Sequence, residues 1–123
     1  MSVITNTNLQ AIVDNTETKR EIVDFIKANV GSEGEQEQLV QFINASNDVT
    51  KLSAPPSNDD KLELYGLYKR GLGAKLDKPG MFDFIAKKKY AAWESHGDLT
   101  ATEAQAKYVA HVKNLLALDK PEN

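Results

Sequence analysis

Two tyrosines and a lysine stand close together in the middle of the chain, within residues 64–69 (LYGLYK). On a helix, Tyr65 and Tyr68 are three residues apart and Tyr65 and Lys69 four apart, so the three side chains share one face. An aromatic plane suits a purine ring, and a hydroxyl beside a cation suits a phosphate. Aromatic residues at this spacing are also typical of core packing, and the face alone leaves both interpretations open.

Basic residues gather in the same part of the chain. Residues 61–90 carry eight Lys or Arg against three Asp or Glu, whereas residues 1–60 carry four against ten. Within the run Lys87, Lys88 and Lys89, successive side chains on a helix diverge by about 100°, so only one can face an anion bound by Lys69. The pattern indicates either a localised anion site or a mixed solvated surface, and the net charge of −3 argues against nucleic-acid binding.

No arrangement of residues indicates catalysis. The chain has no cysteine, and its two histidines, His96 and His111, stand fifteen residues apart, outside any metal-ligand spacing. The motifs of zinc proteases, nucleotide-binding loops and serine hydrolases are missing from the sequence. We therefore expect no catalytic residue, no metal and no cofactor, and structural roles for the histidines.

Helical signals fill most of the chain, and no stretch alternates as a strand would. The pattern predicts capping boxes at Thr18–Glu21 and Thr100–Glu103, and an N-cap at Asn58. Residues 31–37 (GSEGEQE) are interpreted as a polar linker. We predict an all-α protein with a short helical turn around residues 9–13 and helices near 19–30, 35–52, 58–71, 85–95 and 101–118.

Four separated motifs together resemble the acyl-CoA-binding protein (diazepam-binding inhibitor) family. They are YGLYK at 65–69, KPGMFDF at 78–84, KKKYAAW at 87–93 and YVAHV at 108–112, and both their order and their spacing fit over about 42–118. The resemblance implies a four-helix up-down-down-up bundle with a long connection between its second and third helices. It also implies non-catalytic binding and intracellular transport or buffering of medium- to long-chain acyl-CoA esters.

The resemblance assigns roles to individual residues. Tyr68 matches the tyrosine that stacks on the adenine, and Tyr108 matches a tyrosine that lines the site from the last helix. The groups that hold the ribose 3′-phosphate correspond to Tyr65, Lys69 and Lys89. Residues expected to line the groove for the acyl chain are Phe42, Leu62, Met81 and Phe84.

Some positions depart from the family pattern. Arg70 replaces the usual glutamine and adds a cation that we expect near the phosphate region. Ile85 stands at a common lysine position, and Tyr90 replaces a tryptophan. Thr50 and Pro55 occupy positions that are often basic. The connection from residue 69 to residue 81 is also slightly shorter than usual.

We divide the chain into an N-terminal helical extension with its linker (1–38) and an acyl-CoA-binding domain (39–123). The extension carries an apolar face of Ile22, Phe25 and Ile26. That face either packs on the bundle itself or serves as a lid, a partner site or a dimer contact.

Long-chain acyl-CoA is the expected partner of a cytoplasmic monomer, with transient contact to membranes or acyl-CoA-using enzymes left open. The alternative function is a helical protein-interaction module that keeps the fold and recruits a protein partner. A CoA-dependent enzyme ranks third, because no general acid or nucleophile can be named.

Overall fold

Helices account for all the regular structure in the computed structural model, which describes residues 3–119. The helices are α1 (Thr7–Asp14), α2 (Arg20–Ala28), α3 (Glu33–Asp48), the short 3-10 helix η1 (Val49–Lys51), α4 (Asn58–Gly71), α5 (Phe84–Ser95) and α6 (Ala101–Leu118). The prediction of an all-α protein is confirmed. None of the helices within this range combines the length and apolar character needed to cross a bilayer.

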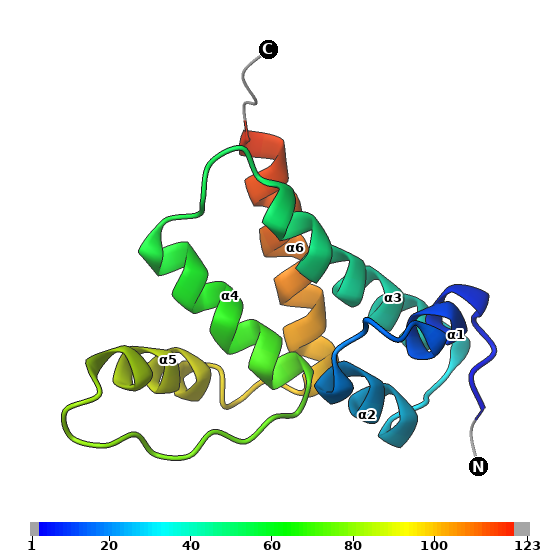
Figure 1. Cartoon of the computed structure of the whole chain (residues 1–123), viewed down its shortest axis with the longest axis horizontal. Coiled ribbons are helices and arrows are strands. Elements are labelled where there is room, and N and C mark those ends of the chain that lie inside the picture. Colours follow the sequence, from blue (N-terminus) through cyan, green and yellow to red (C-terminus); the bar gives the residue numbers. More distant parts are fainter. Residues whose placement is uncertain (1–2, 120–123) are drawn as a thin grey trace.

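The four longer helices form the bundle. Helix α6 packs against both α3 and α4, and α4 also packs against α5 (Figure 1). The chain runs along α3, back along α4, crosses over through residues 72–83, and then follows α5 in the same general sense as α4 before α6 returns (Figure 1). The expected four-helix bundle with its long connection is therefore confirmed.

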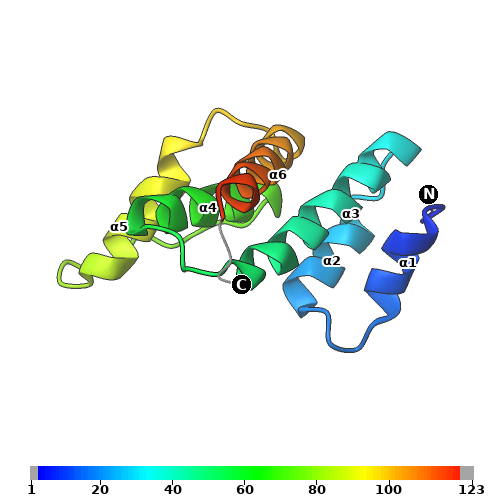
Figure 2. The ribbon, with the colours of Figure 1, turned by 90° about the horizontal axis from the view of Figure 1, so that it is seen from above.

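The N-terminal helices α1 and α2 lie beside α3, on the side that faces away from α5 (Figure 2). Leu9 of α1 and Ile26 of α2 are both 0% exposed and belong to the same apolar core as Phe42 of the bundle. The Gln36 side chain adds polar anchorage, accepting hydrogen bonds from the backbone N–H groups of Thr5 and Asn6 at 2.9 and 3.0 Å. The extension's apolar face thus packs on the bundle itself.

Two capping boxes start the helices that frame the bundle. Thr100 and Glu103 cap each other's backbone N–H groups at the start of α6, as predicted. Ser32 and Glu35 make the same arrangement at the start of α3, which the sequence analysis missed. The expected linker at 31–37 is therefore wrong, because this cap begins the helix at Glu33. The division at residues 38 and 39 falls inside α3 and stays a prediction.

The predicted capping box of Thr18 with Glu21 does not form. The Thr18 hydroxyl donates instead to the carbonyl of Ile12 at 2.7 Å, and α2 begins at Arg20 with no side chain capping it. The Glu21 carboxylate therefore does not cap α2 and can pair with a side chain outside the helix. At α4 the cap is one residue earlier than predicted, because Ser57 rather than Asn58 accepts from the backbone N–H of Asp60.

A glycine sets the distance between α4 and α5. A Cβ added at Gly66 would lie 2.6 Å from the carbonyl oxygen of Ala92, closer than real side chains approach a backbone. Only glycine therefore lets α5 pack this closely on α4, and this packing brings residues of α5 beside the predicted binding face.

Candidate ligand-binding site

Three aromatic rings from three helices pack together in the bundle. Phe42 of α3, Tyr68 of α4 and Tyr108 of α6 have ring centroids 5.2 to 5.7 Å apart. Phe42 is completely buried and Tyr108 nearly so, whereas Tyr68 is half-buried. Phe42 thus lies in the core and supports the two tyrosines, which line an open cavity.

The environment of these tyrosines raises the pKa of their hydroxyls further above physiological pH. Burial, with a smaller contribution from Tyr68, raises the pKa of Tyr108 to about 12. Burial also raises the pKa of Tyr68, and the negative charge of Glu21 adds to that shift. Both phenols are therefore neutral at physiological pH and can donate a hydrogen bond to a ligand.

A third tyrosine lies beside two ammonium groups. The Nζ atom of Lys69 is 5.9 Å from the centroid of the Tyr65 ring, and that of Lys89 is 5.3 Å from it. Lys69 shares a helix face with Tyr65, and Lys89 reaches the ring from α5 because Gly66 allows the helices to approach. The structure thus brings together the three residues that the resemblance assigns to a phosphate.

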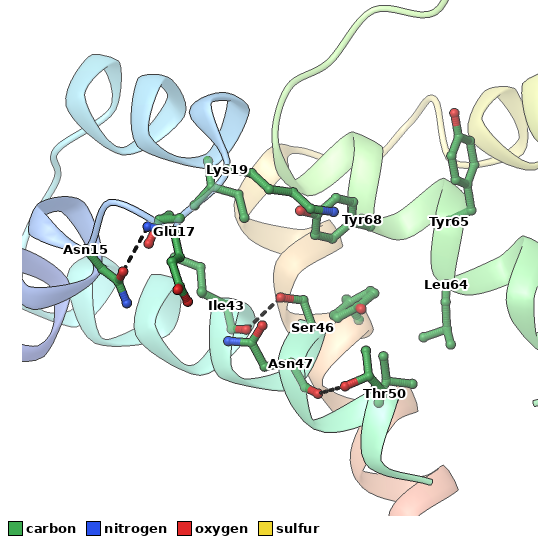
Figure 3. A pocket seen from close by; sticks show the side chains of 14 residues that line it. Asn15, Glu17, Lys19, Ile43, Ser46, Asn47, Thr50, Leu64, Tyr65 and Tyr68 are labelled. Atoms are coloured by element: carbon green, nitrogen blue, oxygen red, sulfur yellow. Dashed lines mark hydrogen bonds between the residues drawn. The ribbon is translucent and has the colours of Figure 1, made fainter. Parts of the chain in front are cut away.

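The tyrosines open onto a cavity of about 560 Å³, a volume typical of small-molecule sites (Figure 3). Helices α3, α4 and α6 and the short helix η1 form part of its wall, and the segment that leads into α2, together with the start of α2, forms the rest (Figure 3). The residues that line it are Asn15, Glu17, Thr18, Lys19, Ile22, Ile43, Ser46, Asn47, Val49, Thr50, Leu64, Tyr65, Tyr68 and Tyr108. The bundle and the N-terminal extension therefore line one cavity together.

The extension also contacts the predicted phosphate-binding lysine directly. Both carboxylate oxygens of Glu21 accept from the ammonium of Lys69, at 3.0 and 3.2 Å. The Lys69 side chain is only 22% exposed and that of Glu21 40%. The sequence pattern does not predict this pair, because no local pattern joins residues 48 positions apart.

None of the residues expected to form an acyl groove lines the cavity of the tyrosines. Met81 is 72% exposed and Phe84 68%, and neither lines the cavity. Leu62 is half-buried and also lies outside the cavity wall, and Phe42 is covered by the tyrosines. Their role toward an acyl chain stays a prediction.

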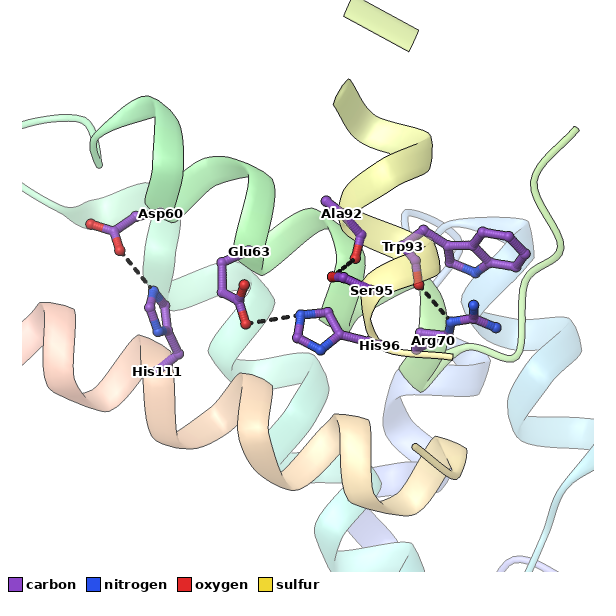
Figure 4. Close-up of polar contacts among 8 residues, drawn as sticks. All are labelled: Asp60, Glu63, Arg70, Ala92, Trp93, Ser95, His96 and His111. Atoms are coloured by element: carbon purple, nitrogen blue, oxygen red, sulfur yellow. Dashed lines mark hydrogen bonds and ion pairs between the residues drawn. The ribbon is translucent and has the colours of Figure 1, made fainter. Parts of the chain in front are cut away.

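Arg70 does not join the lysines beside Tyr65. Its guanidinium carbon lies 3.8 Å from the centroid of the Trp93 ring, and its Nε donates to the Trp93 carbonyl at 2.8 Å (Figure 4). The Trp93 indole in turn donates to the carbonyl of Ala74 at 3.0 Å. Arg70 therefore stacks on α5 and helps hold the crossover, instead of serving as the extra phosphate-region cation that we expected.

The two histidines pair with carboxylates of α4 (Figure 4). His111 Nε2 lies 3.1 Å from Oδ1 of Asp60, and His96 Nε2 lies 2.9 Å from Oε1 of Glu63. Neither histidine lines the cavity of the tyrosines. Within residues 3–119 no three His, Cys, Asp or Glu side chains are grouped as metal ligands.

Comparison with known proteins points to one family. The family model described as acyl CoA binding protein matches residues 39–112. An acyl-CoA-binding protein homolog of Caenorhabditis elegans is 42% identical over 80 residues, which cover 63% of this chain and 93% of the relative. Enoyl-CoA delta isomerase 2 of Rattus norvegicus is 37% identical over 91 residues, 72% of this chain but only 23% of the isomerase.

The fold comparison agrees. The crystal structure of an acyl-CoA-binding protein of Oryza sativa superposes with a TM-score of 0.65 at 32% identity, covering 70% of this chain and 96% of that one. The family match begins at residue 39, so α1, α2 and residues 33–38 of α3 lie outside it. By sequence over most of its length and by fold, this chain belongs to the acyl-CoA-binding protein family.

Proposed function

We propose that the chain binds medium- to long-chain acyl-CoA esters without altering them, and transports or buffers them in the cytoplasm as a monomer. The observation that carries the proposal is the pair of ammonium groups, Lys69 and Lys89, within 6 Å of the Tyr65 ring. Tyr65 also lines the cavity to which Tyr68 and Tyr108 contribute their rings. Cations beside an aromatic cavity suit a ligand that joins a phosphate to a purine.

The headgroup and the acyl chain contribute differently to binding. An ammonium and a phosphate about 4 Å apart near a surface attract each other by up to about 4 kcal/mol before desolvation. Each buried methylene of the acyl chain adds at most about 0.8 kcal/mol. The headgroup should therefore select CoA esters over free fatty acids, while chain length sets much of the affinity.

A non-catalytic role fits the chemistry of the cavity wall. Among its residues the acid–base groups are Glu17, Lys19 and the three tyrosines, and no serine or carboxylate there pairs with a histidine. The isomerase relative does not alter this proposal, because this chain spans 23% of that enzyme.

The test is calorimetry of the full chain with palmitoyl-CoA, using palmitate as the comparison ligand. We expect Lys89→Ala to weaken palmitoyl-CoA binding by about 1–3 kcal/mol, the value of a charge-assisted contact. Lys88→Ala is the matched control, because it removes the same charge from the neighbouring position and should leave affinity unchanged. Unchanged affinity in a folded Lys89→Ala variant would refute the assignment of the phosphate.

A protein-interaction module remains the second candidate, favoured by one observation. Met81, Phe82, Phe84 and Ile85 are 68 to 83% exposed around the start of α5. Grouped exposed apolar side chains are typical of contact surfaces. The same calorimetry separates the two functions, because a module without a ligand site would bind neither palmitoyl-CoA nor palmitate.

A further inference from the structure

The ion pair of Glu21 with Lys69 joins the extension to the family domain at a functional position. Glu21 lies in the first turn of α2, outside the segment 39–112 that matches the family. Its carboxylate contacts Lys69 Nζ through both oxygens, at 3.0 and 3.2 Å. The lysine that is expected to hold a phosphate thus already holds an anion.

The position of Glu21 is built into the fold. Ile22 and Ile26, on the same helix, are 6% and 0% exposed, so their burial fixes which face α2 turns toward the bundle. Upstream, the Thr18 hydroxyl is bonded to the carbonyl of Ile12, which fixes the turn that enters α2. The carboxylate is therefore carried by a packed helix and not by a loose terminus.

The neighbouring lysine provides an internal comparison. Lys89 has no carboxylate within ion-pairing distance among residues 3–119, although it lies as close to Tyr65 as Lys69 does. A phosphate that bridges the two lysines would meet one available ammonium and one that is paired. It would have to displace the Glu21 carboxylate or remain close to a charge of the same sign.

We propose that Glu21 is a specificity-determining residue of the acyl-CoA site, whose carboxylate competes with the ligand's 3′-phosphate for Lys69. The inference rests on the function proposed above and deepens it. Glu21 lowers affinity selectively for ligands that carry the 3′-phosphate and so narrows the preference for them over dephosphorylated esters. The negative charge of Glu21 also helps to raise the pKa of Tyr68, the predicted adenine-stacking residue, so Glu21 lies close to the same site.

The test compares the full chain with its Glu21→Gln variant by calorimetry, using palmitoyl-CoA and 3′-dephospho-palmitoyl-CoA. We expect Glu21→Gln to bind palmitoyl-CoA about three- to tenfold more tightly, from release of a partly exposed ion pair and of like-charge repulsion. Affinity for the dephosphorylated ester should change less than about twofold. In a Lys69→Met background the gain from Glu21→Gln should fall below about twofold.

Asp24→Asn is the matched control. It removes one negative charge from the same helix, but Asp24 pairs with Arg20 and not with a residue of the bundle. Its affinity for palmitoyl-CoA should equal that of the unmodified chain, and circular dichroism should show that both variants keep their helix content.

Three results would overturn the inference. If the unmodified chain binds palmitoyl-CoA and Glu21→Gln leaves its affinity unchanged, Glu21 does not compete with the ligand, and the proposed function stands. If both esters bind more tightly to Glu21→Gln by the same factor, the carboxylate acts on access to the cavity and not on the phosphate. If no variant binds either ester, the proposed function fails and the competition fails with it.

Discussion

The bundle and the N-terminal extension line one cavity together, and they place opposite charges beside it. The bundle supplies the tyrosine rings of the wall and, next to Tyr65, the ammonium groups of Lys69 and Lys89. The extension supplies wall residues from Asn15 to Ile22 and the carboxylate of Glu21, which pairs with Lys69. The bundle carries the groups that suit a phosphorylated nucleotide, and the Glu21 carboxylate of the extension neutralises part of the positive charge at Lys69. The contrast supports the proposal that a segment outside the residues matched by the family model tunes a site whose proposed binding groups all lie within them.

The largest expected effects come from core residues, which should contribute strongly to stability in both regions. Phe42 and Ile26 are both 0% exposed, one in the bundle and one in the extension. Phe42→Ala should lower the free energy of unfolding by about 3–5 kcal/mol and Ile26→Ala by about 2–5 kcal/mol, because each leaves a cavity. Urea titrations followed by far-UV circular dichroism and by Trp93 fluorescence measure both losses.

The two spectroscopic probes report on different parts of the protein. Circular dichroism follows all the helices, whereas the fluorescence of the single tryptophan follows α5 of the bundle. Ile26→Ala should shift the circular dichroism transition to lower urea than the fluorescence transition, since the extension can open before the bundle. Phe42→Ala should shift both transitions together. A loss below about 1 kcal/mol for Ile26→Ala would contradict the packing of the extension on the core.

Local rules explain what could be predicted within the bundle. Thr100 and Glu103 are three residues apart, so their mutual capping depends on nothing but a helix start. Tyr65 and Lys69 share a face for the same short-range reason. The approach of Lys89 from another helix followed only from the family resemblance, and its physical basis, the close packing allowed by Gly66, needed the structure.

The extension shows where local rules fail. The spacing of Thr18 and Glu21 predicts a capping box, but the carbonyl of Ile12 takes the threonine hydroxyl and Lys69 takes the carboxylate. The first partner lies six residues before Thr18 and the second 48 residues after Glu21, so the three-residue spacing of a capping box contains neither. Exposure is likewise set by tertiary packing, because Met81 and Phe84 are 72% and 68% exposed and neither lines the cavity.

Stability at alkaline pH tests the burial of Tyr108, one of the tyrosines that line the cavity. Because burial raises the pKa of Tyr108 from 10.0 to about 12, the folded protein retains a proton that the unfolded chain loses. The contribution of Tyr108 to stability should therefore be level below about pH 10 and fall by on the order of 1–2 kcal/mol as the pH rises toward 12. Tyr108→Phe should remove the part of the fall in stability that comes from the Tyr108 phenol.

Denaturant titrations of both proteins across this pH range measure the difference. Parallel stability curves for the unmodified chain and Tyr108→Phe would contradict the burial of this phenol. Glu21→Gln extends the comparison to the other region, because it should lower the pKa of Tyr68, which the Glu21 charge helps to raise. Ultraviolet titration of the phenols would record that change.

We propose that Lys69, Lys89 and Tyr65 hold the 3′-phosphate of an acyl-CoA ester. Calorimetry of the unmodified full chain with palmitoyl-CoA and with 3′-dephospho-palmitoyl-CoA tests it most directly, because the ligands differ in that group alone. We predict about tenfold or more tighter binding of palmitoyl-CoA, corresponding to at least about 1.4 kcal/mol. Equal affinities for the two esters would contradict the assignment of the 3′-phosphate to these three residues.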